Sequence, residues 1–177
     1  MRLEKSENLD NVYKLFGICA HHCSNIEYRI ALLLHPAMWA KHRPHLNNKN
    51  QETQNTRDIK EWTAAMQRFD EALDKAEQDI DDLYNMPLGN LIKQINGNYE
   101  LSDEQAKYLG DILKKRNYVI HKMWGDYGRR LKDPLVIKEM LRELQTYEPY
   151  FRAASDWLWE QASLLNGISD VEVETSK

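Results

Sequence analysis

The chain has 177 residues, of which 42% are hydrophobic and 29% are charged. These proportions are ordinary for a globular protein with one domain. The first residues are polar and charged and no window approaches eighteen consecutive apolar residues, so we expect neither a signal peptide nor a membrane span. A cytoplasmic protein without a membrane partner is the resulting expectation. The formal net charge of −4 argues against a general affinity for nucleic acid.

Helices should dominate, because the chain contains only 7 glycines and 5 prolines. The first predicted helix covers about residues 6–34. Glu27 lies beside its apolar stripe, where it could pair with a basic group on another helix. The stripe follows spacings of 3 and 4 that are typical of bundle packing, and it consists of Leu9, Val12, Phe16, Cys19, Cys23, Ile26, Ile30 and Leu33.

Two cysteines of this helix, Cys19 and Cys23, are four residues apart, a spacing that seldom permits a disulfide. Together with His22 they could in principle bind zinc with a fourth ligand from elsewhere. Both cysteines nevertheless lie on the apolar stripe, and a free cysteine is commonly a small core residue. We therefore favour reduced core thiols and expect no metal and no cofactor.

The helical pattern fails between residues 35 and 56, where Pro36 and Pro44 are followed by a polar run rich in Asn and Gln. The sequence predicts a surface loop here. A loop of this length is unusual in a compact domain, so it is either disordered or placed over a binding site.

A second long helix is expected at residues 57–85, and a short helix is expected at 87–95. The apolar stripe of the long helix repeats the spacings of 3 and 4 with Ile59, Trp62, Met66, Phe69, Leu73, Ala76, Ile80 and Leu83. The next long helix should begin at Ser102, because Ser102 with Gln105 three residues later forms a capping box.

The last predicted helix runs from Asp133 to about Asn166, and its apolar phase is preserved across Pro149. We expect either a kinked helix or two abutting helices that share one face. Residues 168–177 are polar and are predicted to be a disordered tail. The fold class is therefore all-α, an antiparallel helical bundle of four long helices plus a short helix, in a single domain at residues 1–167.

The third long helix carries an arginine on its apolar stripe. Spacings of 3 and 4 connect Ala106, Leu109, Leu113, Arg116, Ile120 and Met123. A charged guanidinium at such a position is costly unless it is paired, opens into a cleft or meets an anion. Asn117 and His121 are four residues apart and should lie on one flank of the helix beside Arg116.

These three side chains suit cleavage of a ribose phosphodiester without a metal ion. Arginine can bind the phosphate, and histidine can exchange a proton near neutral pH. Asparagine can orient either group. Arg29 and His35 have a comparable spacing, but they lack an adjacent amide, and Pro36 predicts that their helix ends there.

The segment 114–132 carries seven basic residues and one acidic residue, a net charge of +6, within a chain of net charge −4. Such a basic segment indicates a binding site for a phosphate ligand, although a solvated helix face is the alternative. We predict RNA contacts by Lys114, Lys115, Lys122, Arg129 and Arg130. Tyr118, Trp124 and Tyr127 could stack on bases, or they could belong to the core or an interface.

The segment from Arg116 through Asn117 to His121 resembles the Arg-polar-x(3–5)-His motif of the HEPN (higher eukaryotes and prokaryotes nucleotide-binding) superfamily. These helical-bundle proteins include many metal-independent endoribonucleases of toxin–antitoxin, antiviral-defence and RNA-processing systems. The resemblance implies a ribonuclease, a hydrolase of RNA that attacks through the 2'-hydroxyl. The similarity in helical architecture extends over most of the chain, whereas the similarity in sequence motif is limited to six residues.

The resemblance also implies a homodimer whose two motifs face each other across one cleft. Arg116 would hold the scissile phosphate, His121 would transfer protons and Asn117 would orient the pair. Glu27 is the candidate for a supporting polar residue from the first helix. A non-catalytic helical module that binds RNA, a nucleotide or a partner protein is the alternative, and an antitoxin or regulatory protein is a further possible partner.

Overall fold

The computed structural model describes residues 2–166, and every regular element in that range is a helix, which confirms the predicted all-α bundle. The predicted tail at 168–177 lies outside the described residues. None of the helices in residues 2–166 has an apolar stretch long enough to cross a membrane. In chain order the elements are α1 (Arg2–Asn55), α2 (Ile59–Tyr84), α3 (Leu88–Asn98), α4 (Asp103–Asn117), a π-helical turn η1 (Tyr118–Lys122), α5 (Met123–Tyr127), a 3₁₀ helix η2 (Gly128–Arg130) and α6 (Pro134–Asn166).

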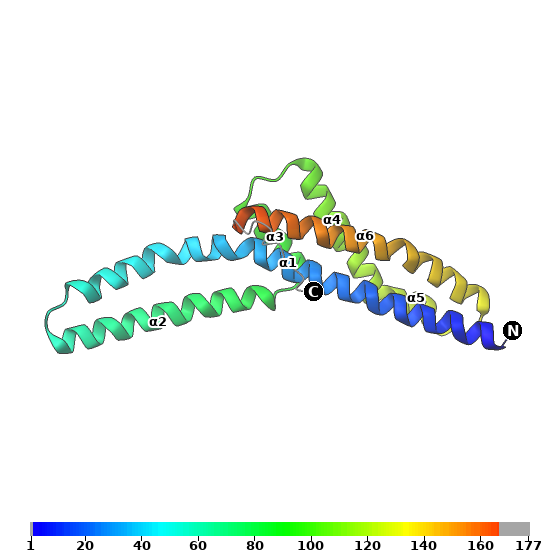
Figure 1. The fold of residues 1–177 in the computed structure, drawn as a ribbon, viewed down its shortest axis with the longest axis horizontal. Coiled ribbons are helices and arrows are strands. Elements are labelled where there is room, and N and C mark those ends of the chain that lie inside the picture. Colours follow the sequence, from blue (N-terminus) through cyan, green and yellow to red (C-terminus); the bar gives the residue numbers. More distant parts are fainter. Residues whose placement is uncertain (1, 167–177) are drawn as a thin grey trace, which may run out of the picture.

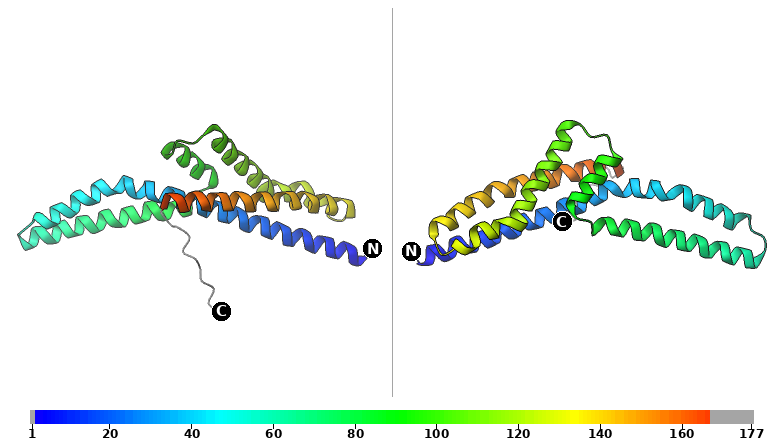
Figure 2. Two further views of the ribbon diagram at one scale, coloured as in Figure 1. Left: turned by 45° about the horizontal axis from the view of Figure 1, so that its top comes forward. Right: turned by 180° about the vertical axis from the view of Figure 1, so that it is seen from behind.

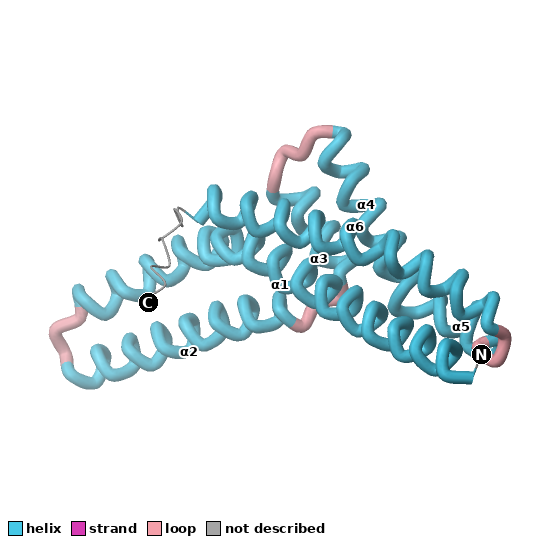
Figure 3. Tube along the Cα trace, turned by 45° about the vertical axis from the view of Figure 1, so that its right-hand side comes forward, coloured by secondary structure: helices cyan, strands magenta, loops and turns pink. Residues whose placement is uncertain are grey.

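The molecule is elongated because α1 runs through its whole length (Figure 1). Helix α2 lies along the C-terminal half of α1, and α6 lies along the N-terminal half, an arrangement that the two views of Figure 2 also show. Helices α3, α4 and α5 pack beside the N-terminal half of α1 and α6. Short connections join the helices, as Figure 3 shows.

The predicted loop at 35–56 is wrong, because α1 continues as a helix through Pro36 and Pro44 to Asn55. A proline removes one backbone donor but does not end a helix that is held by packing. Here the packing partner is α2: His42 lies 3.1 Å from Asp79, and Thr53 is buried. The polar Asn/Gln run concealed this contact, since it faces solvent on the opposite side. We call the hairpin formed by residues 35–84 the arm.

The seam predicted for α2 is buried only near the base of the arm, where Ala76, Ile80 and Leu83 pack against α1. At the tip, Ile59 is 77% exposed and Trp62 is 46% exposed. Burial decreases toward the tip because α1 ends at Asn55 and no other described helix covers that end.

The main core lies between the N-terminal half of α1 and α6. Helix α6 runs parallel to α1, since Cys19 contacts Leu144 and, ten residues later, Arg29 pairs with Asp156. The antiparallel arrangement predicted for the bundle is therefore wrong for this pair of helices. The chain returns to the N-terminal end of α1 through α4 and α5, so α6 begins at that end (Figure 1). Helix α6 is one continuous helix through Pro149. Fully buried core side chains include Val12, Ile26, Ile30, Met140, Phe151, Ala154 and Leu158.

Helix α3 places four apolar side chains in the core and thereby fixes the entry to α4. These are Leu88, Leu91, Ile92 and Ile95. The helix follows Pro87 and includes Gly97, so it is one turn longer than predicted. Its N-terminal residues lie beside the C-terminal part of α4, where a Cβ added at Gly89 would lie 3.8 Å from Leu113 Cδ2.

The predicted capping box at the start of α4 is confirmed. The Ser102 hydroxyl accepts a hydrogen bond from the Gln105 backbone N–H, and the Gln105 side chain accepts one from the Ser102 N–H. Both bonds satisfy donors that the first helical turn would otherwise leave unpaired.

We expect Ser102→Ala to lower the free energy of unfolding by about 1 kcal/mol, because the substitution removes the cap of α4. Urea unfolding followed by circular dichroism measures this loss. Ser24→Ala is the matched control, since Ser24 is exposed in the interior of α1. Equal stability of the two variants would show that the capping box does not stabilise α4.

Candidate functional site

The candidate site is built on the C-terminal part of α4, where Arg116 lies on the packed face as predicted. The buried residues of this face are Leu109, Ile112, Val119 and Met123. Arg116 falls between Ile112 and Val119 at spacings of 4 and 3. The predicted neighbours Leu113 and Ile120 are only partly buried and border this face, and Ala106 is exposed.

The helix changes its winding directly after Arg116. Residues Tyr118–Lys122 form a π-helical turn, in which the Met123 N–H bonds to the Tyr118 carbonyl five residues earlier. In a regular α-helix, residues five apart lie about 140° apart around the axis. The wider π turn reduces this separation, and such turns occur frequently at functional sites. No local sequence pattern predicts this π turn.

Because of this turn, Arg116 and His121 are in direct contact. Arg116 Nη1 lies 2.8 Å from His121 Nε2 and donates to Asn117 Oδ1 at 3.1 Å. The prediction paired Asn117 with His121 as neighbours one turn apart, whereas Arg116 is the residue that contacts both. The three residues are therefore one hydrogen-bonded group.

The contact fixes the protonation state of the imidazole. A guanidinium has only donors, so His121 Nε2 must accept and the ring proton must be on Nδ1. His121 is neutral in this arrangement, and its side chain is exposed. Because Nε2 carries the only ring lone pair of this tautomer, it can take a proton from a substrate only after Arg116 Nη1 releases it.

Glu27 of α1 holds the other side of the guanidinium. Arg116 Nη2 donates to Glu27 Oε1 at 2.5 Å, and the two side chains are 19% and 29% exposed. The pairing that we predicted for Glu27 is confirmed. One consequence is that a single chain already balances the charge of Arg116, so its place on the packed face does not by itself require a second chain.

One donor of Arg116 is left over. Its Nε is buried and has no hydrogen-bond partner within the described residues. An unpaired buried donor costs free energy, and each case in a native structure calls for a reason. An arginine with an unpaired buried donor is consistent with a side chain that is held for binding.

The Arg116–His121 pair opens into a shallow pocket of about 460 Å³ between α4 and the start of α3. The polar residues of its lining all come from α4 and η1, whereas the start of α3 contributes Leu88 and Gly89. We call it the motif pocket. It is lined by Pro87, Leu88, Gly89, Leu113, Arg116, Asn117, His121 and Lys122.

The basic residues that we predicted to bind RNA do not form one patch. Lys122 lines the motif pocket, and Lys114 and Lys115 line a neighbouring pocket. Arg129 and Arg130 lie on η2 and line neither; the Arg130 guanidinium instead lies 5.9 Å from the Tyr127 ring.

The aromatic residues of the segment have different environments. Tyr118 lines the neighbouring pocket, whereas Trp124 packs against Tyr13 and Phe16 and Tyr127 is buried. Of these three aromatic residues, Tyr118 is therefore the one that is placed to contact a ligand in either pocket.

The sequence did not predict a role for Glu143 of α6, whose carboxylate accepts hydrogen bonds from three tyrosine hydroxyls. Tyr127 donates to it at 2.9 Å, Tyr118 at 3.4 Å and Tyr147 at 3.5 Å. Burial, and then the nearby Glu143 carboxylate, raise the pKa of Tyr118 to about 12. No local signal identifies Glu143 or Tyr147, because α6 is separate from the motif in sequence.

The second Arg–His pair is not assembled. Arg29 pairs with Asp156 at 3.2 Å and lies 5.5 Å from the Trp159 ring, whereas His35 packs against Trp39. The helix also continues beyond Pro36, contrary to the prediction. Arg29 and His35 serve here as controls for the motif residues.

Cys19 and Cys23 are free and buried, as the core interpretation predicts. Burial raises the pKa of Cys19 to about 11 and that of Cys23 to about 12, which disfavours the thiolate form that zinc binds. His22 lies 3.7 Å from Glu148. Across residues 2–166, no group of three or more His, Cys, Asp or Glu side chains is arranged to hold a metal ion.

Comparison of the chain with protein-family models, curated proteins and solved structures gives no match.

Proposed function

We propose that this protein is a metal-independent endoribonuclease of the HEPN type. The observation that carries the proposal is the 2.8 Å contact between Arg116 Nη1 and His121 Nε2 at an open pocket. It joins a phosphate-binding group to a proton-transfer group, and Asn117 completes the set at 3.1 Å. The three residues match the superfamily motif in type and order.

The proposed reaction forms one bond to phosphorus and breaks another. His121 Nε2 takes the proton of the 2'-hydroxyl as the 2'-oxygen attacks, and Arg116 stabilises the charge that grows on the phosphate oxygens. The bond from phosphorus to the 5'-oxygen then breaks, and that oxygen leaves with the proton that His121 took from the 2'-hydroxyl. The products are a 2',3'-cyclic phosphate and a 5'-hydroxyl.

Glu27 has a supporting role in this proposal. The Glu27 carboxylate holds Nη2, so the guanidinium plane has a fixed orientation and Nη1 faces His121. For catalysis, Nη1 must exchange its internal partners for a phosphate oxygen. A phosphate is a stronger acceptor than a neutral imidazole or amide, so the exchange is favourable.

We further propose that two copies form a homodimer with a composite site, as the superfamily resemblance implies. Light scattering after size exclusion should give twice the mass of the chain at tens of micromolar. A strict monomer that cleaves RNA would show that one motif suffices, which the complete Glu27–Arg116–His121 arrangement within one chain allows.

A non-catalytic helical module is the second candidate, and one observation favours it. Glu27 already neutralises Arg116, and both hydrogen bonds of Nη1 go to residues of the same chain, so Nη1 has no free donor for a phosphate in this state. Such a module would bind RNA, a nucleotide or a partner protein such as an antitoxin. The exposed Ile59 and Trp62 at the arm tip suit a protein partner.

Incubation of the purified protein with total RNA, with and without a chelator, separates the two candidates. Wild-type protein should degrade the RNA, and a His121→Ala protein prepared in the same way should not. Intact RNA with both proteins would favour the binding module.

A further inference from the structure

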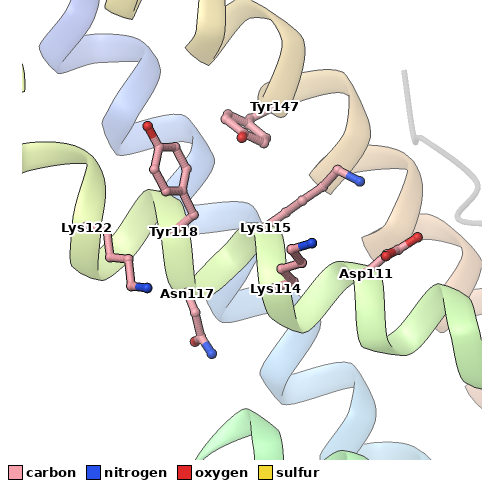
Figure 4. A pocket seen from close by; sticks show the side chains of 7 residues that line it. All are labelled: Asp111, Lys114, Lys115, Asn117, Tyr118, Lys122 and Tyr147. Atoms are coloured by element: carbon pink, nitrogen blue, oxygen red, sulfur yellow. The ribbon is translucent and has the colours of Figure 1, made fainter. Parts of the chain in front are cut away.

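A second pocket adjoins the motif pocket and has a volume of about 570 Å³. Asn117 and Lys122 line both pockets, so a ligand that lies across these two residues can occupy both. We call it the flanking pocket. Figure 4 shows its lining side chains, which come from α4, η1 and α6: Asp111, Lys114, Lys115, Asn117, Tyr118, Lys122 and Tyr147.

The flanking pocket combines ammonium groups with aromatic rings. Lys114 and Lys122 are exposed, and the Lys115 ammonium lies 4.3 Å from the Tyr150 ring centre. A basic groove with aromatic side chains is the combination that binds single-stranded nucleic acid, because phosphates meet the cations and bases stack on the rings.

The rings of Tyr118 and Tyr147 are held in place by contacts with other residues of α6. Both hydroxyls reach the Glu143 carboxylate, at 3.4 Å for Tyr118 and 3.5 Å for Tyr147. Tyr147 also stacks on Phe151, with ring centres 5.9 Å apart and planes 18° apart. The ring of Tyr147 is therefore held in place before any ligand binds, which reduces the entropy lost on stacking.

We propose that the flanking pocket binds the nucleotide next to the cleaved phosphodiester, with its base stacked on Tyr147 and its phosphate held by Lys122 and Lys114. Asp111 lies beside Lys114 and at the far end of the pocket from Lys122 (Figure 4). Its carboxylate accepts a hydrogen bond from an amino group of the base. This assignment rests on the proposed function for the place of the nucleotide beside the cleaved phosphodiester, whereas the stacking on Tyr147 requires only that the ligand is RNA.

The test compares two fluorescein-labelled single-stranded RNAs of equal length, one of mixed sequence and one built from abasic riboses. Binding is measured by fluorescence anisotropy in a His121→Ala background, which prevents cleavage. Tyr147→Leu should raise the Kd of the mixed RNA about 5- to 100-fold and that of the abasic chain less than about 2-fold. Tyr147→Phe, which keeps the ring, should rescue most of the loss.

Lysine variants provide the complementary result. Lys114→Ala and Lys122→Ala should weaken the binding of both RNAs to the same extent. Each substitution should also lower the slope of log Kd against log salt concentration by about the amount that one phosphate contact contributes. Tyr28→Leu is the control, since Tyr28 is 54% exposed on α1 and lines neither pocket.

Two results would overturn the proposal. One is an unchanged Kd of Tyr147→Leu for the mixed RNA, and the other is an equal loss for both RNAs, which would mean that the ring only maintains the fold. Cleavage by the wild-type protein is scored separately. RNA that is bound through Tyr147 but never cut would refute the ribonuclease proposal and leave the flanking pocket intact.

Discussion

His121→Ala should lower the rate of RNA cleavage by about 10²- to 10⁴-fold, the range expected when a general acid–base group is removed. His121 is exposed and, within residues 2–166, its side chain hydrogen-bonds to Arg116 alone, so the folded state should be nearly unaffected. Cleavage of labelled RNA measures the rate, and circular dichroism with thermal melting measures the folded state.

Arg116→Ala should lower the rate by about 10²- to 10³-fold, as for loss of a group that stabilises transition-state charge. It should also lower the free energy of unfolding by about 1–2 kcal/mol, because it leaves the partly buried Glu27 carboxylate without its partner. Adding Glu27→Gln to Arg116→Ala removes the unpaired charge. The double variant should recover stability but not cleavage.

Arg29→Ala and His35→Ala are the matched controls, since they replace the same residue types in a pair that the fold keeps apart. Both variants should cleave RNA at the wild-type rate. If they lose activity while the Arg116 and His121 variants retain it, the site has been assigned to the wrong pair.

Cleavage should persist in EDTA and should require the 2'-hydroxyl. The reaction proposed for Arg116 and His121 uses no metal ion, and its nucleophile belongs to the substrate. DNA, or an RNA with a 2'-deoxy sugar at the cut position, should therefore resist completely. The products should carry 2',3'-cyclic phosphate and 5'-hydroxyl ends, which end-specific enzymatic labelling identifies.

The cleavage rate should fall at high salt, because dissolved ions screen the contacts of the basic residues with phosphates. Products with 5'-phosphate ends, or activity that appears only with a divalent metal, would exclude this mechanism.

The sequence by itself determined features that depend on residues close together in the chain. Apolar spacings of 3 and 4 predicted the helices and their buried faces, and the Ser102–Gln105 capping box marked the start of α4. The place of Arg116 on a packed face followed from the same periodicity. Glu27 was found because it lies beside the seam of a helix that must pack on others. Each of these depends on backbone hydrogen bonding and on helical period, which are local.

Only the tertiary structure decided how distant segments support or alter these local preferences. Packing on α2 keeps α1 helical through Pro36 and Pro44, although the prolines alone predict a break. The π turn brings Arg116 to His121, although their spacing in a regular helix would separate them. Tyr147 joins the flanking pocket only because α6 passes beside α4. For α1 and for the flanking pocket, the physical reason is a contact between segments far apart in sequence, which supplies a free energy that no local pattern encodes.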